Sequence, residues 1–177
     1  MAVANYLESL DSTAYQRYLE KLGSIRLDKC PYDILETEWV DDVTCWPPVT
    51  YPDVYTYLID TPGQFTRESL KAYKSLEAYN YALNGWVQAL LVLRKGSSTT
   101  RDSDIIMLRG KVSRSQRLNE QPHCIWMAVK KDGSVVTAHC TCMAGYVDFC
   151  VAIISVSYFH NMFDATALWK SYFNFKC

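Results

Sequence analysis

The dipeptide Asp132-Gly133 separates two runs of residues that favour β-strands, 125–130 and 134–142. Asp-Gly in this position is a strong signal for a β-hairpin, because both residues tolerate the left-handed backbone of a tight turn. We therefore expect the two runs to pair as antiparallel strands. If the turn has two residues, Lys131 pairs with Ser134, and counting back places Ile125 opposite Cys140.

The rest of the chain divides by its hydrophobic period. A second pair of strands is expected at 86–93 and 104–112, and helical spacing or capping signals occur at 4–22, 52–60, 66–83, 151–162 and 164–172. Gly23 and the pair Asn84-Gly85 are expected to stop the first and third helices. The order of helices, strands and helices predicts an α+β fold, with N-terminal helices, a small antiparallel sheet and C-terminal helices.

Composition limits the classes of function. The chain has 177 residues, of which 49% are apolar and 21% charged, values typical of a folded domain. The net charge of -1 gives no overall attraction to nucleic acid. We expect no membrane span, because no run of about 18 apolar residues occurs. The N-terminus does not resemble a signal peptide, which predicts an intracellular protein, nuclear or cytoplasmic, whose seven cysteines are thiols or metal ligands.

The cysteines are most concentrated near the end of the expected hairpin, where Cys140 and Cys142 are followed by Cys150. Residues i and i+2 of a strand point to the same face, with Cα atoms about 6.5 Å apart. A bend at the strand end then allows both sulfurs to reach one Zn²⁺ ion. A turn at Gly145 brings Cys150 back toward them, so the pattern predicts three of the four ligands of a structural zinc site.

The segment His139–Gly145, HCTCMAG, resembles a SWIM zinc finger, whose pattern is C-x-C, a short spacer and C-x-H. It is most similar to the SWIM segment found upstream of YqaJ-like viral recombinase nuclease domains in animal proteins. The resemblance covers roughly residues 28 to 150 and also rests on the runs LKAYKSLEAY at 70–79, GWV at 85–87, SQRL at 115–118 and KDG at 131–133.

The resemblance implies a zinc-binding module that acts beside a DNA-processing nuclease and binds DNA or a protein partner without catalysis. On this interpretation the chain divides into an N-terminal helical arm (1–27), a helical segment (28–85), a SWIM-like zinc-finger domain (86–163) and a C-terminal helix (164–177).

The chain departs from the family pattern at three points. Val147 stands where the family has glycine, Ala152 stands where it has the histidine ligand, and the nuclease domain does not follow. A truncated or decayed copy is therefore an alternative, as is a metal-free protein-interaction domain in which the three cysteines are apolar core residues.

Two histidines are candidates for the missing ligand. If residues 151–160 are helical, His160 lies about 15 Å along the helix from Cys150 and points to another side. His123 is better placed, because the predicted register sets it opposite Cys142, on the same face. The predicted metal site is therefore Cys140, Cys142, Cys150 and His123.

A basic run provides a second candidate site. The basic residues are Arg109, Lys111, Arg114 and Arg117, with Trp86 and Trp126 nearby. Basic groups interleaved with aromatic residues can hold a phosphate backbone while bases stack on the rings. The alternative is a solvated strand edge, where basic residues prevent edge pairing, and the balanced net charge favours it.

No catalytic motif is present: there is no phosphate-binding glycine loop and no H-E-x-x-H sequence. We expect a non-enzymatic protein with no small-molecule substrate.

Overall fold

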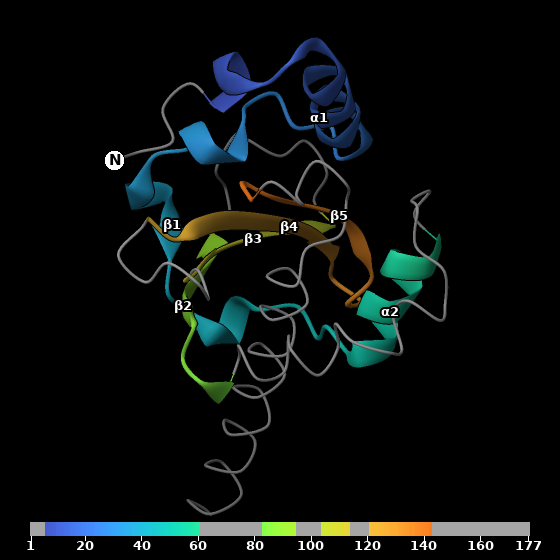
Figure 1. Cartoon of the computed structure of the whole chain (residues 1–177). Helices are drawn as coiled ribbons and strands as arrows, with labels where there is room; N and C mark the ends of the chain where they lie inside the picture. Colours follow the sequence, from blue (N-terminus) through green and yellow to red (C-terminus); the bar gives the residue numbers. More distant parts are fainter. Residues whose placement is uncertain (1–5, 61–82, 95–103, 114–120, 143–177) are drawn as a thin grey trace, which may run out of the picture.

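The computed structural model describes residues 6–60, 83–94, 104–113 and 121–142, and its centre is a five-stranded antiparallel sheet (Figure 1). The strands are β1 (Trp39–Val40), β2 (Val87–Leu93), β3 (Ile105–Val112), β4 (His123–Lys130) and β5 (Val135–Cys140). Their order across the sheet is β1-β2-β3-β4-β5, so each strand pairs with the next one in the chain. The four longer strands agree with the predicted strand segments.

The predicted fold class is wrong. The described residues form one sheet of five strands with only two α-helices, α1 (Ser12–Ser24) and α2 (Tyr51–Asp60), so sheet predominates over helix. One reason is β1, whose two residues pair with Leu93 and Val92 of β2 and are too few to show a period of two in the sequence. The predicted C-terminal helices at 151–162 and 164–172, and most of the helix predicted at 66–83, lie outside the described residues.

The N-terminal helix is shorter than predicted, because Asp11 starts a new helix inside the expected one. Its side chain accepts hydrogen bonds from the amides of Thr13 and Ala14, which makes Asp11 the N-cap of α1. The preceding residues form a separate 3₁₀ turn, η1 (Tyr6–Ser9). The helix continues past Gly23 to Ser24, and the left-handed residue after it is Arg26, with φ of 50°.

Short 3₁₀ turns connect α1 to α2 around the β1 edge. They are η2 (Pro31–Asp33), η3 (Glu36–Glu38) and η4 (Val43–Cys45). Helix α2 begins where predicted, with Pro52 in its first turn. The predicted left-handed stop before β2 is also confirmed, because Gly85 has φ of 70°.

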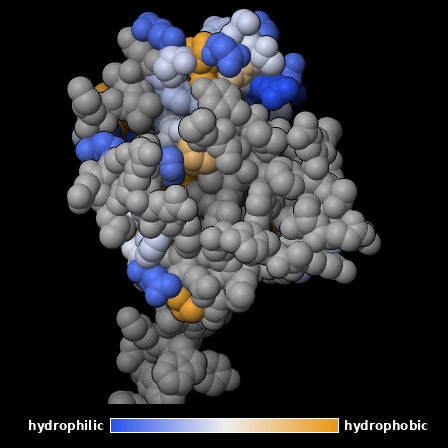
Figure 2. Space-filling model, in the orientation of Figure 1, coloured by the Kyte–Doolittle hydropathy of each residue, from blue (hydrophilic) through white to orange (hydrophobic). Residues whose placement is uncertain are grey.

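Two hydrophobic clusters cover the two faces of the sheet. On one face lies the N-terminal segment, residues 6–33. Its side chains Tyr18, Leu22 and Ile25 pack against Met107 and Trp126. On the other face, Val54 and Tyr57 of α2 are part of a cluster with alternate residues of the strands. Figure 1 shows α1 and α2 on opposite sides of the sheet accordingly. Figure 2 shows mainly hydrophilic residues on the outer surface of the N-terminal segment.

The hairpin of β4 and β5 has the predicted register near Cys140, but its loop differs from the predicted turn. The Lys130 amide donates to the Ser134 carbonyl, so the loop is one residue longer than the two-residue turn expected. A shift between Ala128 and Val129 then compensates, and Ile125 pairs with Cys140 as predicted.

The tip of this hairpin packs against the segment before α2. Gly133 is buried there, with φ of 97°, and a Cβ atom added to it would overlap the carbonyl oxygen of Pro48. The hairpin tip thus depends on a residue without a side chain.

Candidate functional site

Cys140 and Cys142 lie on the same face of the sheet, as the C-x-C spacing predicts. Both are buried and belong to the hydrophobic cluster that α2 covers. The Cys142 amide donates a hydrogen bond to the Cys140 sulfur over 3.3 Å. An amide aimed at a sulfur stabilises the thiolate form, which is the form that binds a metal.

The hairpin continues one residue pair beyond β5. The Thr141 amide donates to the Cys124 carbonyl, and the Cys124 amide donates to the Thr141 hydroxyl, both over 3.0 Å. The backbone is therefore held close to strand geometry up to the second cysteine.

His123 is the first residue of β4 and is half-buried. Alternation along β4 places it on the face of Ile125 and Met127, which is also the face of the two cysteines. However, among the described residues no three histidine, cysteine or acidic side chains, these included, lie close enough together to hold a metal ion. Cys150 and His160 lie outside the described residues.

The basic run is split by the structure. Arg109 is buried, with 8% of its surface exposed, and it forms an ion pair with Glu36. Its guanidinium also lies over the Trp39 ring, 4.5 Å from the ring centre. Lys111 is exposed on β3, and Arg114 and Arg117 lie outside the described residues. Arg109 therefore holds the β1 edge to the sheet and does not face solvent.

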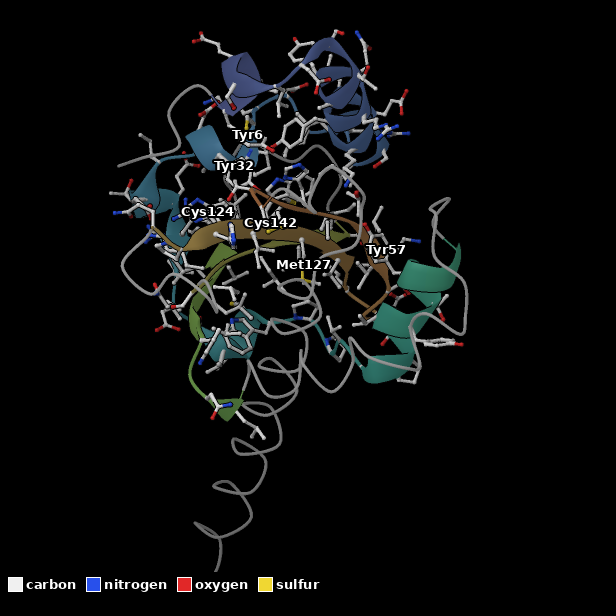
Figure 3. The ribbon with its side chains drawn as sticks, viewed as in Figure 1. Tyr6, Tyr32, Tyr57, Cys124, Met127 and Cys142 are labelled. Atoms are coloured by element: carbon white, nitrogen blue, oxygen red, sulfur yellow. The ribbon has the colours of Figure 1, made fainter. Side chains whose placement is uncertain are left out.

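Sequence reasoning missed a buried cluster around His139, on the opposite face of β5 from the two cysteines. Tyr32 Oη lies 2.9 Å from His139 Nδ1, and Tyr6 Oη lies 3.3 Å from Nε2, so a tyrosine hydroxyl contacts each ring nitrogen. The imidazole also stacks on Trp126, its direct partner on β4, with ring centres 6.1 Å apart. Figure 3 shows Tyr6 and Tyr32 together on the N-terminal side of the sheet, with Met127 on the other side.

Tyr18 of α1 completes the cluster. Its hydroxyl accepts a hydrogen bond from Trp126 Nε1 over 3.1 Å and lies 3.2 Å from the Cys30 sulfur. Burial raises the pKa of Tyr18, of Tyr32 and of the Cys30 thiol, so all three stay neutral. The three tyrosines come from η1, α1 and η2, so the cluster joins the whole N-terminal segment to β4 and β5.

His139 is neutral in this setting. Burial, together with the smaller effect of the nearby positive charge of Lys21, lowers its pKa to about 3. Both ring nitrogens are occupied by tyrosine hydroxyls, and the residue is almost fully buried. We therefore assign His139 a structural role in docking the N-terminal segment. The signal that could have found the cluster is the hairpin register, which places Trp126 opposite His139.

Cys124 is a third cysteine near the hairpin end, and it differs from the other two. It pairs with Lys111 across β3 and β4 and packs with the His139 side of the sheet. Burial raises the pKa of its thiol, although Lys111 and Arg109 oppose this shift. Cys124 therefore lies on the face opposite to Cys140 and Cys142.

Comparison with known proteins identifies no relative: no family model matches the chain, and no curated protein or solved structure matches it. Among the described residues, no helix has the length and apolar character needed to cross a membrane.

Proposed function

We propose that this protein is a zinc-binding, non-catalytic interaction module of the SWIM-like type, with Cys140 and Cys142 as half of the metal site. One observation carries the proposal: two thiols share a face at the end of the hairpin, and an amide is aimed at one of the sulfurs. Cys150 is the proposed third ligand and His123 the proposed fourth. Zinc bound there would fix the hairpin end to the residues that follow it.

The donor chemistry fits zinc. Thiolates are soft ligands, and they suit a structural zinc site, which is usually tetrahedral with four protein ligands. Binding would release the thiol protons. The proposed partner is DNA or a protein, bound at the surface that zinc orders. Because Arg109 is buried and ion-paired, the basic run does not support the DNA alternative.

Metal analysis of the full chain, purified without chelator, tests the proposal. We expect about one zinc per chain in the wild type, and less than about 0.2 in C140S, C142S and C150S, because a structural site needs its full set of ligands. H123A tests the fourth ligand in the same assay. Cys124→Ser is the matched control, because Cys124 is close in sequence but lies on the other face. A wild-type chain without zinc, or loss of zinc only in C124S, contradicts the proposal.

A second candidate function is a metal-free protein-interaction domain, and the burial of the cysteines favours it. Cys140 has no exposed surface and packs within a continuous hydrophobic cluster. Thiols in this environment behave as small apolar groups. If this candidate is correct, each of Cys140→Ala and Cys142→Ala changes the free energy of unfolding by the same amount whether or not chelator is present. A zinc site predicts that both variants matter more when zinc is present.

A further inference from the structure

Trp39 carries a buried hydrogen-bond donor that the fold does not use. The residue lies on β1, at one edge of the sheet (Figure 1), and only 5% of its surface is exposed. Among the described residues, nothing accepts a hydrogen bond from its Nε1–H group. A buried donor without an acceptor is destabilising and rare in folded proteins. A ligand that accepts this hydrogen bond would explain why the donor is present.

The Arg109 guanidinium lies beside this donor. Its central carbon is 4.5 Å from the centre of the Trp39 ring, and the indole nitrogen belongs to the same ring system. Within the described part of the chain, the guanidinium donates to the Glu36 carboxylate. Because a guanidinium has several N–H donors in a fixed fork, it can bind one anionic group through two of them.

Glu36 marks the position that such an anionic group would take. The Glu36 side chain is 73% exposed, whereas the Arg109 side chain is only 10% exposed. The position next to the guanidinium is therefore reached from solvent on the side of Glu36. An ion pair with one exposed partner contributes little stability, so an incoming anion can replace the Glu36 carboxylate at small cost.

Lys111 adds a second positive charge on the same face of the sheet. Side chains alternate along β3, so Arg109 and Lys111 share the face of Met107, which belongs to the cluster that contains Trp39. Burial raises the pKa of the Cys124 thiol, and both cations oppose this shift, so their charges act on the same place. Two positive charges against one Glu36 carboxylate favour a ligand that carries more than one negative charge.

We propose that Arg109, Lys111 and the Trp39 Nε1–H group form a binding site for a phosphate monoester carried by a protein partner. Glu36 occupies this site in the free chain and acts as an internal competitor. A phosphate monoester on a side chain has a charge of about −1.5 to −2 and three acceptor oxygens, so it can pair with Arg109 and accept from Trp39 at once. A phosphodiester of DNA carries only a single charge, as Glu36 does, and has no such advantage.

Calorimetric titration of the full chain with a short phosphoserine peptide, whose flanking residues are small and uncharged, tests the competitor. Glu36→Gln should bind the peptide about fivefold more tightly than the wild type, because the competing carboxylate has lost its charge. Glu38→Gln removes a charge from the same turn and is the matched control, with the affinity of the wild type expected.

The unused donor is tested by Trp39→Phe, which keeps an aromatic ring at this position. We expect the peptide to bind at least about tenfold more weakly than to the wild type, because a hydrogen bond to a charged group is lost. Trp46→Phe makes the same change in the cluster on the other face of the sheet and should leave the affinity unchanged. Equal affinities for Trp39→Phe and the wild type overturn the proposal.

The indole N–H signals in a nuclear magnetic resonance spectrum test the contact without depending on the stability of Trp39→Phe. The Trp39 signal should move downfield when the peptide saturates Glu36→Gln, and an unmoved signal at saturation contradicts the proposal. A Kd weaker than about 1 mM for Glu36→Gln does so too. Equal binding of the unphosphorylated peptide, or of single-stranded DNA without a terminal phosphate, also rejects a site for phosphate monoesters.

The inference rests on the proposed interaction function, but not on the metal. The site lies on the opposite face of the sheet from the cysteines of the proposed zinc site, so peptide binding should be the same with and without chelator. Binding that is lost with chelator overturns the independent site described above. A chain that contains no zinc and still binds the peptide supports this site and contradicts only the zinc proposal.

Discussion

At the scale of single residues, Gly133 shows how closely the hairpin tip is fitted to its surroundings. Its backbone conformation, with φ of 97°, is one that side chains rarely adopt, and the space that a Cβ would need is taken by the backbone of Pro48. The neighbouring Asp132 supports the same turn by accepting a hydrogen bond from the Ser134 amide over 2.9 Å, which lowers the pKa of its carboxyl. The turn is therefore favoured by the conformational freedom of Gly133 and by the hydrogen bond that the Asp132 carboxylate accepts.

We predict that Gly133→Ala lowers the free energy of unfolding by about 1–3 kcal/mol from backbone strain alone, and by more once Pro48 has to move. Urea unfolding measures the change. Gly23→Ala is the matched control, because it lies in α1 with nothing within 4 Å of the added atom. That variant should gain about 0.5–1 kcal/mol, since alanine favours a helix over glycine. Equal stability of the two variants would contradict the packing described at the tip.

At the scale of elements, the N-terminal segment and the β4–β5 hairpin are joined by a hydrophobic cluster that contains a buried polar contact. Tyr32 is central to it, because its hydroxyl lies 2.9 Å from His139 Nδ1 and also donates to the Cys124 carbonyl over 3.2 Å. A buried hydrogen-bonding group that loses its partner destabilises a protein more than the average hydrogen bond stabilises it.

Tyr32→Phe is therefore expected to lower the free energy of unfolding by about 1–3 kcal/mol, although the ring and its packing remain. The measurement is urea unfolding followed by near-ultraviolet circular dichroism, which reports on the packed aromatic residues. Tyr15→Phe removes an exposed hydroxyl from α1 and should have little effect. An unchanged midpoint for Tyr32→Phe would show that the hydroxyl contributes nothing to docking.

Features with a local sequence signal could be predicted, whereas contacts between distant segments of the chain could not. Asp132-Gly133 and the β-rich runs are local, and they predicted the hairpin and the pairing of Ile125 with Cys140. The assumed loop was one residue too short, and the result held only because an irregularity in β5 restored the register. The meeting of Tyr6 and Tyr32 on His139 has no local signal, because residues more than 100 positions apart come together. The burial of Arg109 has the same cause, since Glu36 and Trp39 come from a distant turn and strand.

At the scale of the whole molecule, the stability should depend on pH through His139. The unfolded chain binds a proton at this residue below pH about 6.5, whereas burial keeps the folded chain from doing so until about pH 3. Between these values the unfolded state holds more protons, so the free energy of unfolding falls as the pH falls.

We expect a slope of at most about 1.4 kcal/mol per pH unit from this group between pH 6 and 4. Urea titrations at several pH values, with chelator present to remove any metal effect, measure the slope. His139→Gln keeps hydrogen-bonding capacity without titrating in this range, and its curve should be flatter than that of the wild type. Parallel curves for the two proteins would place the acid sensitivity in other groups.

The alternation along β5 has a practical consequence for anyone labelling or redesigning this protein. His139 lies on one face of the sheet, and Cys140 and Cys142 lie on the other face. A spectroscopic probe on the His139 imidazole would report on the attachment of the N-terminal segment. A probe on the Cys140 sulfur would report on the hydrophobic cluster that α2 covers. Two adjacent residues, His139 and Cys140, can therefore be used to monitor the two faces of the sheet separately.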